Sequence, residues 1–213
     1  MKERPIIFNS DMVRAILDGR KTQTRRVVWP MSLCIPYRNS MDKIKLRKTD
    51  NHYLFDFHYE DGTISTIYGT RSKYFVGDRL WVRETHGIQL EPCEDYPNGC
   101  VIYKADLPDE SDFQYEGGGS AWRPSIYMPR WASRITLEIV NVRVERLKDI
   151  CNNAQRDFIA EGIQPIPYIG NQRLDDYKIP FINLWDSIYG KKYSWESNPW
   201  VWVIEFKRVK EQK

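Results

Sequence analysis

The sequence predicts a mainly β, α+β fold, in which a small closed or half-closed β-barrel has short helices over its ends. Segments with alternating apolar residues are numerous, whereas only about three short segments have helical spacing. The first and last segments are both apolar and both expected in the core, so strand pairing should be mainly non-local. The chain has 213 residues, of which 41% are hydrophobic and 14% aromatic, which suits one domain with a sizeable core.

The N-terminal elements are a strand, a helix and a second strand. The apolar run PIIF at 5–8 predicts a short strand. Ser10 is expected to cap the following helix, and Gly19 stands where a glycine commonly ends one. Residues 24–28 predict the second strand.

The middle of the chain predicts strands separated by turns. YLFDFHY and DGTISTIY, joined at Asp61-Gly62, predict a two-stranded hairpin inserted into a smaller fold. The turn Gly77-Asp78 leads into another strand, and CVIYKAD predicts a further one. The acidic, glycine-ending stretch 106–119 predicts a loop, and the segment 122–134 is irregular.

The C-terminal part predicts a long strand, two helices and a final strand. RITLEIVNVRVERL alternates as a strand does. Asn152 and Gln155 resemble a capping box for a short helix that ends at Gly162. PFINLWDSIYG predicts an amphipathic helix ended by Gly190. The last strand, WVWVIEFKRV, is apolar on both faces, so it is expected at a central or barrel position.

Charge is unevenly distributed along the chain. The formal net charge is +3, with basic clusters at 20–26, at 43–48 and around Arg123, Arg130 and Arg134, while EPCEDYPNG and DLPDESDFQYEGGG are acidic. Segregated charge can steer a polyanion toward its site. A solvated basic face with a solvated acidic loop is the alternative.

The sequence gives no indication of a metal, a cofactor or a membrane segment. The four cysteines form no CxxC pair and the three histidines form no metal-binding array, so free, mostly buried thiols are expected. No apolar run approaches the ~20 residues that span a bilayer. The N-terminus lacks the apolar region of a secretory signal, so the expected location is the cytoplasm, or the host cytoplasm if a phage encodes the protein.

The stretch LDGRKTQTRRVV, residues 17–28, concentrates charge between two apolar segments. Residues 20–26 hold four cations and two threonines. They form either a solvated turn or the floor of a site for an anionic ligand. Residues 21 and 24 would point to opposite faces of a regular strand, so Lys21 and Thr24 can converge only if Lys21 lies in the turn after Gly19.

Four motifs, in chain order, resemble the ASCH domain of the PUA-like superfamily, whose barrels often bind RNA or modified bases. They are GRKTQTRR after a short helix, VGDRLWVRET, the helix end AEGI, and the last strand WVWVIEF. WRPSIYMPRWASRITLEI resembles the bacteriophage and prophage branch of this family. The motifs span residues 5 to 209, which implies a single domain over 1–213 with insertions at about 31–70 and 91–120.

The resemblance implies two kinds of activity. One kind of relative is a small amidohydrolase that removes acetyl from N4-acetylcytidine, and residue-by-residue matching makes Thr24 the nucleophile, Lys21 its activator and Glu161 the proton carrier or orienter. A lysine that stays charged would instead hold an oxyanion or a phosphate. The other kind binds nucleic acid, and some members have ribonuclease activity.

The expected partner is RNA, DNA, a nucleoside or a nucleotide, bound in a basic cleft. Aromatic rings beside arginines can stack on bases while the guanidinium groups hold phosphates. Glu84 is alternatively a partner for an arginine, Glu161 an exposed helix end, and Trp131 a plug of the barrel mouth. Catalysis, oligomeric state and a role as a protein-interaction module remain open. The expected binding residues are Arg20, Arg25, Arg26, Glu84, Trp122, Arg123, Arg130 and Trp131.

Overall fold

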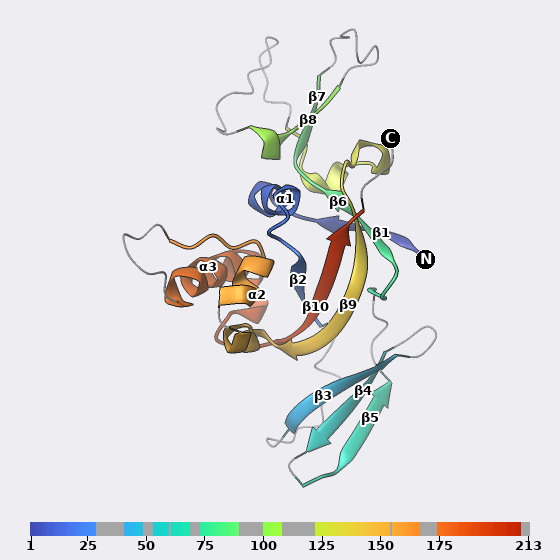
Figure 1. Ribbon diagram of the computed structural model, residues 1–213, viewed down its shortest axis with the longest axis vertical. Helices are drawn as coiled ribbons and strands as arrows, with labels where there is room; N and C mark the ends of the chain where they lie inside the picture. Colours follow the sequence, from blue (N-terminus) through green and yellow to red (C-terminus); the bar gives the residue numbers. More distant parts are fainter. Residues whose placement is uncertain are drawn as a thin grey trace. The chain divides into compact units, whose positions relative to one another are not determined.

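The computed structural model describes residues 1–28, 41–48, 53–59, 61–68, 73–89, 100–107, 122–153, 155–166 and 174–209 (Figure 1). This part of the chain is mixed α and β, with more strand than helix, as the sequence predicts. The strands are β1 (Glu3–Ile7), β2 (Gln23–Val27), β3 (Met41–Lys48), β4 (Tyr53–Tyr59), β5 (Ile64–Tyr68), β6 (Arg79–Arg83), β7 (His86–Gln89), β8 (Cys100–Tyr103), β9 (Thr136–Arg146) and β10 (Trp200–Arg208). The helices are α1 (Ser10–Leu17), α2 (Gln155–Ala160), α3 (Leu174–Tyr193) and the 3-10 helices η2 (Lys104–Asp106), η3 (Ser125–Tyr127), η4 (Arg130–Ala132) and η5 (Leu147–Asn153).

The main sheet has five strands in the order β1-β6-β9-β10-β2. β1 pairs with β6 in parallel, while β6 with β9 and β10 with β2 are antiparallel. Among the described residues no pairing joins the end strands β1 and β2, so this sheet is not a closed barrel. The prediction of a central last strand is confirmed, because β10 lies between β9 and β2 and is buried from Trp200 to Ile204.

The predicted hairpin is present but belongs to a three-stranded sheet. β4 pairs with β5 through the turn at Gly62, whose φ of 78° is accessible to glycine at low cost. The prediction of a two-stranded ribbon was wrong in extent, because β3 adds a third strand against β4. β7 and β8 form a separate antiparallel pair.

The N-cap of α1 is Asn9, one residue before Ser10, which the sequence predicts as the cap. The side chain of Asn9, not that of Ser10, accepts a hydrogen bond from the Met12 backbone N–H. Asn9 has an extended backbone, which is the conformation a cap requires, while Ser10 is already helical. Gly19 does end the helix, with a φ of 75° and its N–H donated to the carbonyl of Ile16.

The C-terminal helices differ from prediction at three points. Asn152 lies inside η5, so it does not cap α2. Gly162 ends α2 as predicted, with a φ of 83°. α3 starts at Leu174, six residues before Pro180, where the sequence predicts its start, so Pro180 lies inside the helix. The helix continues past Gly190 to Tyr193.

The described chain divides into two compact units, each assembled from separate segments. Unit 1 contains Met1–Lys21, Gly77–Glu138 and Lys207–Lys213, and unit 2 contains Thr22–Val76 and Ile139–Phe206. In unit 2, α2 and α3 pack their aromatic residues against Val201 and Val203 of β10 (Figure 1). Phe181 contacts both Phe158 and Trp195 edge to face, so this core is largely aromatic.

No helix in the described ranges is both long and apolar enough to cross a membrane.

Candidate functional site

Arg25 is the centre of a buried ionic cluster in unit 2. Its side chain is 1% exposed, and Nη1 donates to Glu161 Oε1 at 2.8 Å. Nη2 donates to Asp157 Oδ2 at 3.2 Å, and Nε donates to Glu145 Oε1 at 3.1 Å. One guanidinium from β2 therefore joins carboxylates from β9, from α2 and from the turn after α2.

Opposing effects act on the charge of Arg25. Burial lowers the pKa of Arg25, but the carboxylates of Glu161 and Glu145 offset this and raise its pKa above the ordinary value. Arg25 therefore stays protonated, and its planar fork suits several carboxylates at once. The cluster links β2, β9 and α2 inside the protein, and the carboxylates neutralise the charge of Arg25.

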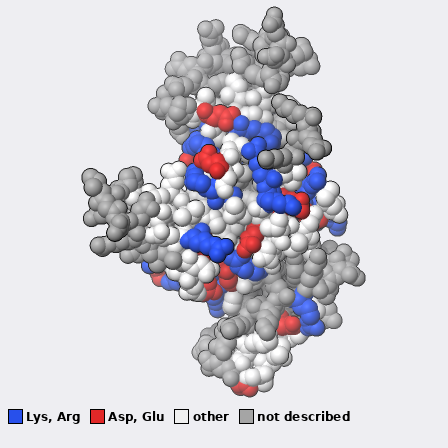
Figure 2. All heavy atoms as spheres, in the orientation of Figure 1, with Lys and Arg blue, Asp and Glu red and all other residues white. Residues whose placement is uncertain are grey.

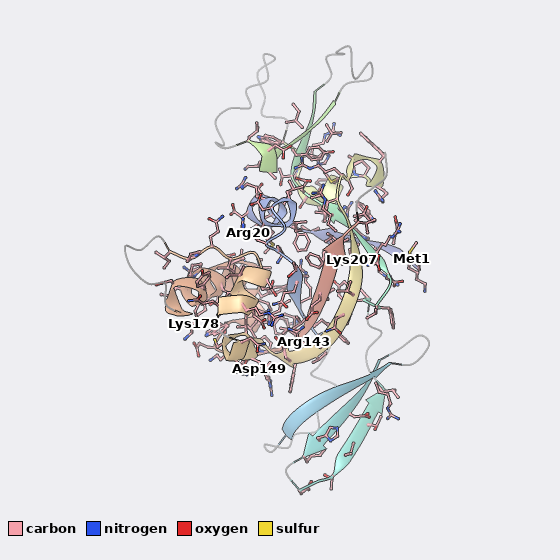
Figure 3. All side chains as sticks on the ribbon, in the orientation of Figure 1. Met1, Arg20, Arg143, Asp149, Lys178 and Lys207 are labelled. Atoms are coloured by element: carbon pink, nitrogen blue, oxygen red, sulfur yellow. The ribbon has the colours of Figure 1, made fainter. Side chains whose placement is uncertain are left out.

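A second arginine, Arg143 on β9, connects this cluster to a pocket (Figure 3). Arg143 Nε donates to Glu145 Oε2 at 3.1 Å, and Nη1 donates to Glu205 on β10. Its Nη2 also reaches the Gln23 side-chain oxygen at 3.5 Å. Gln23 in turn donates from Nε2 to the Asp157 backbone carbonyl at 3.1 Å, so the polar groups around the pocket hold one another in place.

The pocket has a volume of about 370 Å³ and lies wholly within unit 2. Ligand sites in proteins commonly begin near this size. Thr22 fixes one wall, because its N–H donates to the Ala160 carbonyl and its own carbonyl accepts from Phe206 N–H. The lining residues are Thr22, Gln23, Val140, Arg143, Asn153, Arg156, Asp157, Ala160, Glu205 and Phe206.

The charges in and beneath the pocket do not make a basic cleft. Three arginines face four carboxylates, so the group carries a formal charge of 3 − 4 = −1. On the face drawn in Figure 2, lysine and arginine side chains are likewise intermixed with acidic ones. The members of this group are Arg25, Arg143, Arg156, Glu145, Asp157, Glu161 and Glu205.

The predicted catalytic residues are distributed over both units. Lys21 ends the first segment of unit 1, whereas Thr24 and Glu161 belong to unit 2. β2 starts at Gln23, so Lys21 does lie in the turn, as convergence with Thr24 requires. Glu161 is buried rather than an exposed helix end, and Arg25 is the partner that holds it.

Thr24 lies on the face of β2 opposite to the pocket residues. Side chains alternate along a strand, so Gln23 and Arg25 share one face and Thr24 and Arg26 share the other. Arg26 Nη1 donates to Thr24 Oγ1 at 2.8 Å, which agrees with this arrangement. The structure thus brings Arg25 and Glu161 together but does not place Thr24 among the residues that line the pocket.

Lys21 is almost entirely buried, with 2% of its surface exposed. Its ammonium lies 5.4 Å from the centre of the Phe8 ring, also in unit 1. Lysine is among the residues that are least often buried.

Glu84 of unit 1 pairs with an arginine, which is the alternative to a role in binding that the sequence left open. Arg134 donates from Nε and Nη2 to the two carboxylate oxygens of Glu84, both at 3.0 Å, and from Nη1 to Asp106 at 2.6 Å. Burial lowers the pKa of Arg134, but Glu84 and Asp106 outweigh it and raise that pKa. Burial raises the pKa of Glu84, and the contacts with Arg134 oppose that rise. The Arg134 guanidinium also lies over the Tyr103 ring, with Cζ 3.8 Å from the ring centre.

The irregular segment of unit 1 exposes aromatic and basic side chains. Trp131 is 70% exposed, so it does not plug a barrel, and Tyr127 is 72% exposed. Arg123 and Arg130 are also exposed, and Arg130 is bonded to Glu3. Trp122 is half-buried, and Arg20 is half-buried and paired with Asp18. By contrast Trp185 and Trp202 are core residues.

The sequence interpretation missed the carboxylates and the second arginine around the pocket. Arg143 and Glu145 stand two apart on β9, which is a visible polar stripe on one strand face. Asp157 and Glu205 gave no such signal, because only the strand register and the docking of α2 bring them near Arg143. Among the described residues no three His, Cys, Asp or Glu side chains are placed to hold a metal ion, and the described thiol, Cys151, is half-buried and is not part of a disulfide. The side chains of Cys34, Cys93 and Cys100 lie outside the described residues.

Comparison of the chain with protein-family models, with curated proteins and with solved structures gave no match. The interpretation of the site therefore depends on its own geometry.

Proposed function

We propose that this chain is an ASCH-type protein of the PUA-like superfamily that binds a nucleoside, free or within RNA or DNA, in the unit 2 pocket. The observation that carries the proposal is the pocket itself, which is nucleoside-sized and lined by fixed donors and acceptors. The positions of the motifs support the family assignment. GRKTQTRR joins α1 to β2, VGDRLWVRET is a turn followed by β6, AEGI closes α2, and WVWVIEF is β10.

The near-balanced charge of the pocket favours a neutral heterocycle over a phosphate in it. In unit 1, the exposed cations Arg123 and Arg130 and the exposed ring of Trp131 belong to one segment, which suits a separate contact with the backbone and bases of a nucleic acid. Exposed aromatic rings stack on unpaired bases with little regard to sequence. The unit 2 pocket supports nucleoside binding, and the unit 1 segment independently supports contact with single-stranded nucleic acid.

The test is a binding titration with the full chain, using the common nucleosides and a short single-stranded RNA and DNA. Thr22→Trp should fill the pocket without disturbing the backbone hydrogen bonds of residue 22, and it should weaken nucleoside binding at least tenfold, to the order of RT ln 10 or about 1.4 kcal/mol. Ile188→Trp, on the exposed side of α3, is the matched control and should bind as the wild type does.

Salt separates the two kinds of contact in the same titration. Nucleoside binding should be nearly independent of salt, whereas RNA or DNA binding should weaken as salt rises, because phosphate contacts release counterions. Absence of binding to every nucleoside and to both nucleic acids would refute the proposal. Equal binding by the wild type and Thr22→Trp would place the site elsewhere.

Deacylation of an N4-acylated cytidine is the second candidate, and the burial of Lys21 favours it. Incubation of the wild type and of Lys21→Ala with N4-acetylcytidine tests it. Release of acetate by the wild type but not by Lys21→Ala would support this activity. No release by the wild type would remove it, and cleavage of the RNA in the titration would instead indicate the ribonuclease.

A further inference from the structure

One carboxylate in the pocket wall has an oxygen without a donor. Asp157 is 6% exposed and lines the pocket. Its described side-chain hydrogen bonds, from Arg25 Nη2 and Asn153 Nδ2, both end on Oδ2. No described residue donates to Oδ1. Oδ1 is not among the buried side-chain atoms that lack a partner, so this oxygen is accessible at the pocket surface, where a ligand donor can reach it. A hydrogen bond to a charged acceptor is stronger than one to a neutral acceptor.

Two neighbouring polar side chains, Arg143 and Gln23, already have hydrogen-bond partners within the protein. Arg143 already donates to Glu145, Glu205 and Gln23. The Gln23 amide donates to the Asp157 carbonyl and accepts from Arg143. Arg156 also lines the pocket, but its side chain is exposed to solvent. Among the buried polar side chains of the lining, Oδ1 of Asp157 is therefore the acceptor that a ligand would engage.

The surrounding charge points the same way. The seven ionised groups in and beneath the pocket sum to −1, so an anionic group would be repelled there and a donor would be attracted. Among base edges, the exocyclic amines of cytosine and adenine are donors, while uracil and hypoxanthine present a carbonyl at the same position. Aspartate accepting from an exocyclic amine is an established form of base recognition.

We infer that Asp157 is a specificity-determining residue, whose free Oδ1 selects bases with an exocyclic N–H donor, cytosine or adenine, over their keto counterparts. This inference rests on the proposed function, because it names the class of nucleoside that the same pocket takes. A keto oxygen facing Oδ1 would leave two acceptors opposed without a proton between them, and this unpaired contact is the larger part of the discrimination.

The experiment measures the affinities of the wild-type chain for cytidine and uridine, and for adenosine and inosine, by calorimetric titration. The amino nucleoside of each pair should bind at least about tenfold more tightly, as expected for one hydrogen bond to a charged group. Asp157→Asn should reduce this preference to less than about threefold, because the amide can turn either a donor or an acceptor toward the base. Glu196→Gln, a surface carboxylate paired with Lys148, is the matched control and should keep the preference.

A ligand series keeps the test independent of how Asp157→Asn folds. N4-methylcytidine retains one N–H, whereas N4,N4-dimethylcytidine has none, so the dimethyl compound should bind at least about tenfold more weakly. Wild-type affinities that agree within twofold across each amino and keto pair would overturn the inference while leaving nucleoside binding intact. Retention of the preference by a folded Asp157→Asn, or equal binding of the two methylated compounds, would overturn it as well. Failure of all nucleosides to bind would refute the proposed function and the inference with it.

Discussion

Arg25 shows how a basic sequence motif can be neutralised by the fold. In the sequence it stands among four cations, which favours an anionic ligand. In the structure it is 1% exposed and bonded to Glu145, Asp157 and Glu161. Its charge therefore organises the wall of the pocket and is not available to a phosphate.

Replacing Arg25 should be severely destabilising. Arg25→Met would leave three carboxylates buried without their cation, and breaking buried pairs in this way typically costs about 3–5 kcal/mol. Arg47→Met removes a pair with Asp56 in which the arginine is 58% exposed, so it should cost at most about 1 kcal/mol. Urea denaturation followed by circular dichroism measures both variants. Equal losses of stability would show that the cluster of Arg25 contributes no more than a surface pair.

His86 should make stability depend on pH. It is wholly buried, its Nε2 has no described partner and its Nδ1 lies 3.4 Å from the Glu84 carbonyl. Burial, with the positive charge of Arg123, lowers the pKa of His86 below 6.5 despite the Glu84 carbonyl. Below about pH 6.5 the unfolded chain therefore binds a proton that the folded chain resists, and the free energy of unfolding falls as pH falls, by up to about 1.4 kcal/mol per pH unit.

His86→Asn isolates this contribution. The variant should lose the part of the pH dependence between about pH 6.5 and the lowered folded-state value, whatever its stability at neutral pH. Urea midpoints measured for both proteins between about pH 5 and pH 8 give the two profiles. Parallel profiles across that range would mean that His86 is protonated equally in the folded and unfolded chains.

At the scale of elements, the boundaries of α1 depend on a local contact that the sequence left ambiguous. Asn9 and Ser10 are adjacent, and both are good N-cap residues. The backbone decides between them, because Asn9 is extended and its side chain reaches the Met12 N–H at 2.9 Å.

Asn9→Ala should therefore destabilise the protein by about 1 kcal/mol, since it removes a partner from an otherwise unpaired helical N–H. Ser10→Ala should change stability by less than about half of that value, because Ser10 is inside the first turn and alanine favours the helix. Chemical denaturation of the two single variants provides the comparison. A larger loss for Ser10→Ala would restore Ser10 as the functional cap.

The sequence analysis did not predict the strand β3. Ile44 and Leu46 alternate with lysines and an arginine, which is a strand pattern, but the high charge led to the segment being interpreted only as a basic cluster. Pairing with β4 accounts for it, because a strand at the end of a sheet tolerates charged residues. Apolar residues on both faces were sufficient to identify β10, whereas the lysines and the arginine on one face of β3 concealed its alternation.

At the scale of the whole molecule, strand and helix types could largely be predicted, but the sheet and the site could not. Alternation predicted β9, an apolar run predicted β10 and the turn at Gly77-Asp78 predicted β6, while glycines at positive φ marked the ends of α1 and α2. Sheet order depends on contacts between distant segments, so closure into a barrel was expected and an open five-stranded sheet was found. The same limitation hid Asp157 and Glu205, whose roles exist only once α2 and β10 are in place.

Strands β9 and β10 each pass from one unit to the other along their length, β9 after Glu138 and β10 after Phe206. A shortened protein that keeps a single unit would have to end inside both β9 and β10. The cut would leave backbone amide and carbonyl groups without their hydrogen-bond partners. Expression of either half alone should give insoluble material, so biochemical dissection of this molecule is better done by point substitution than by truncation.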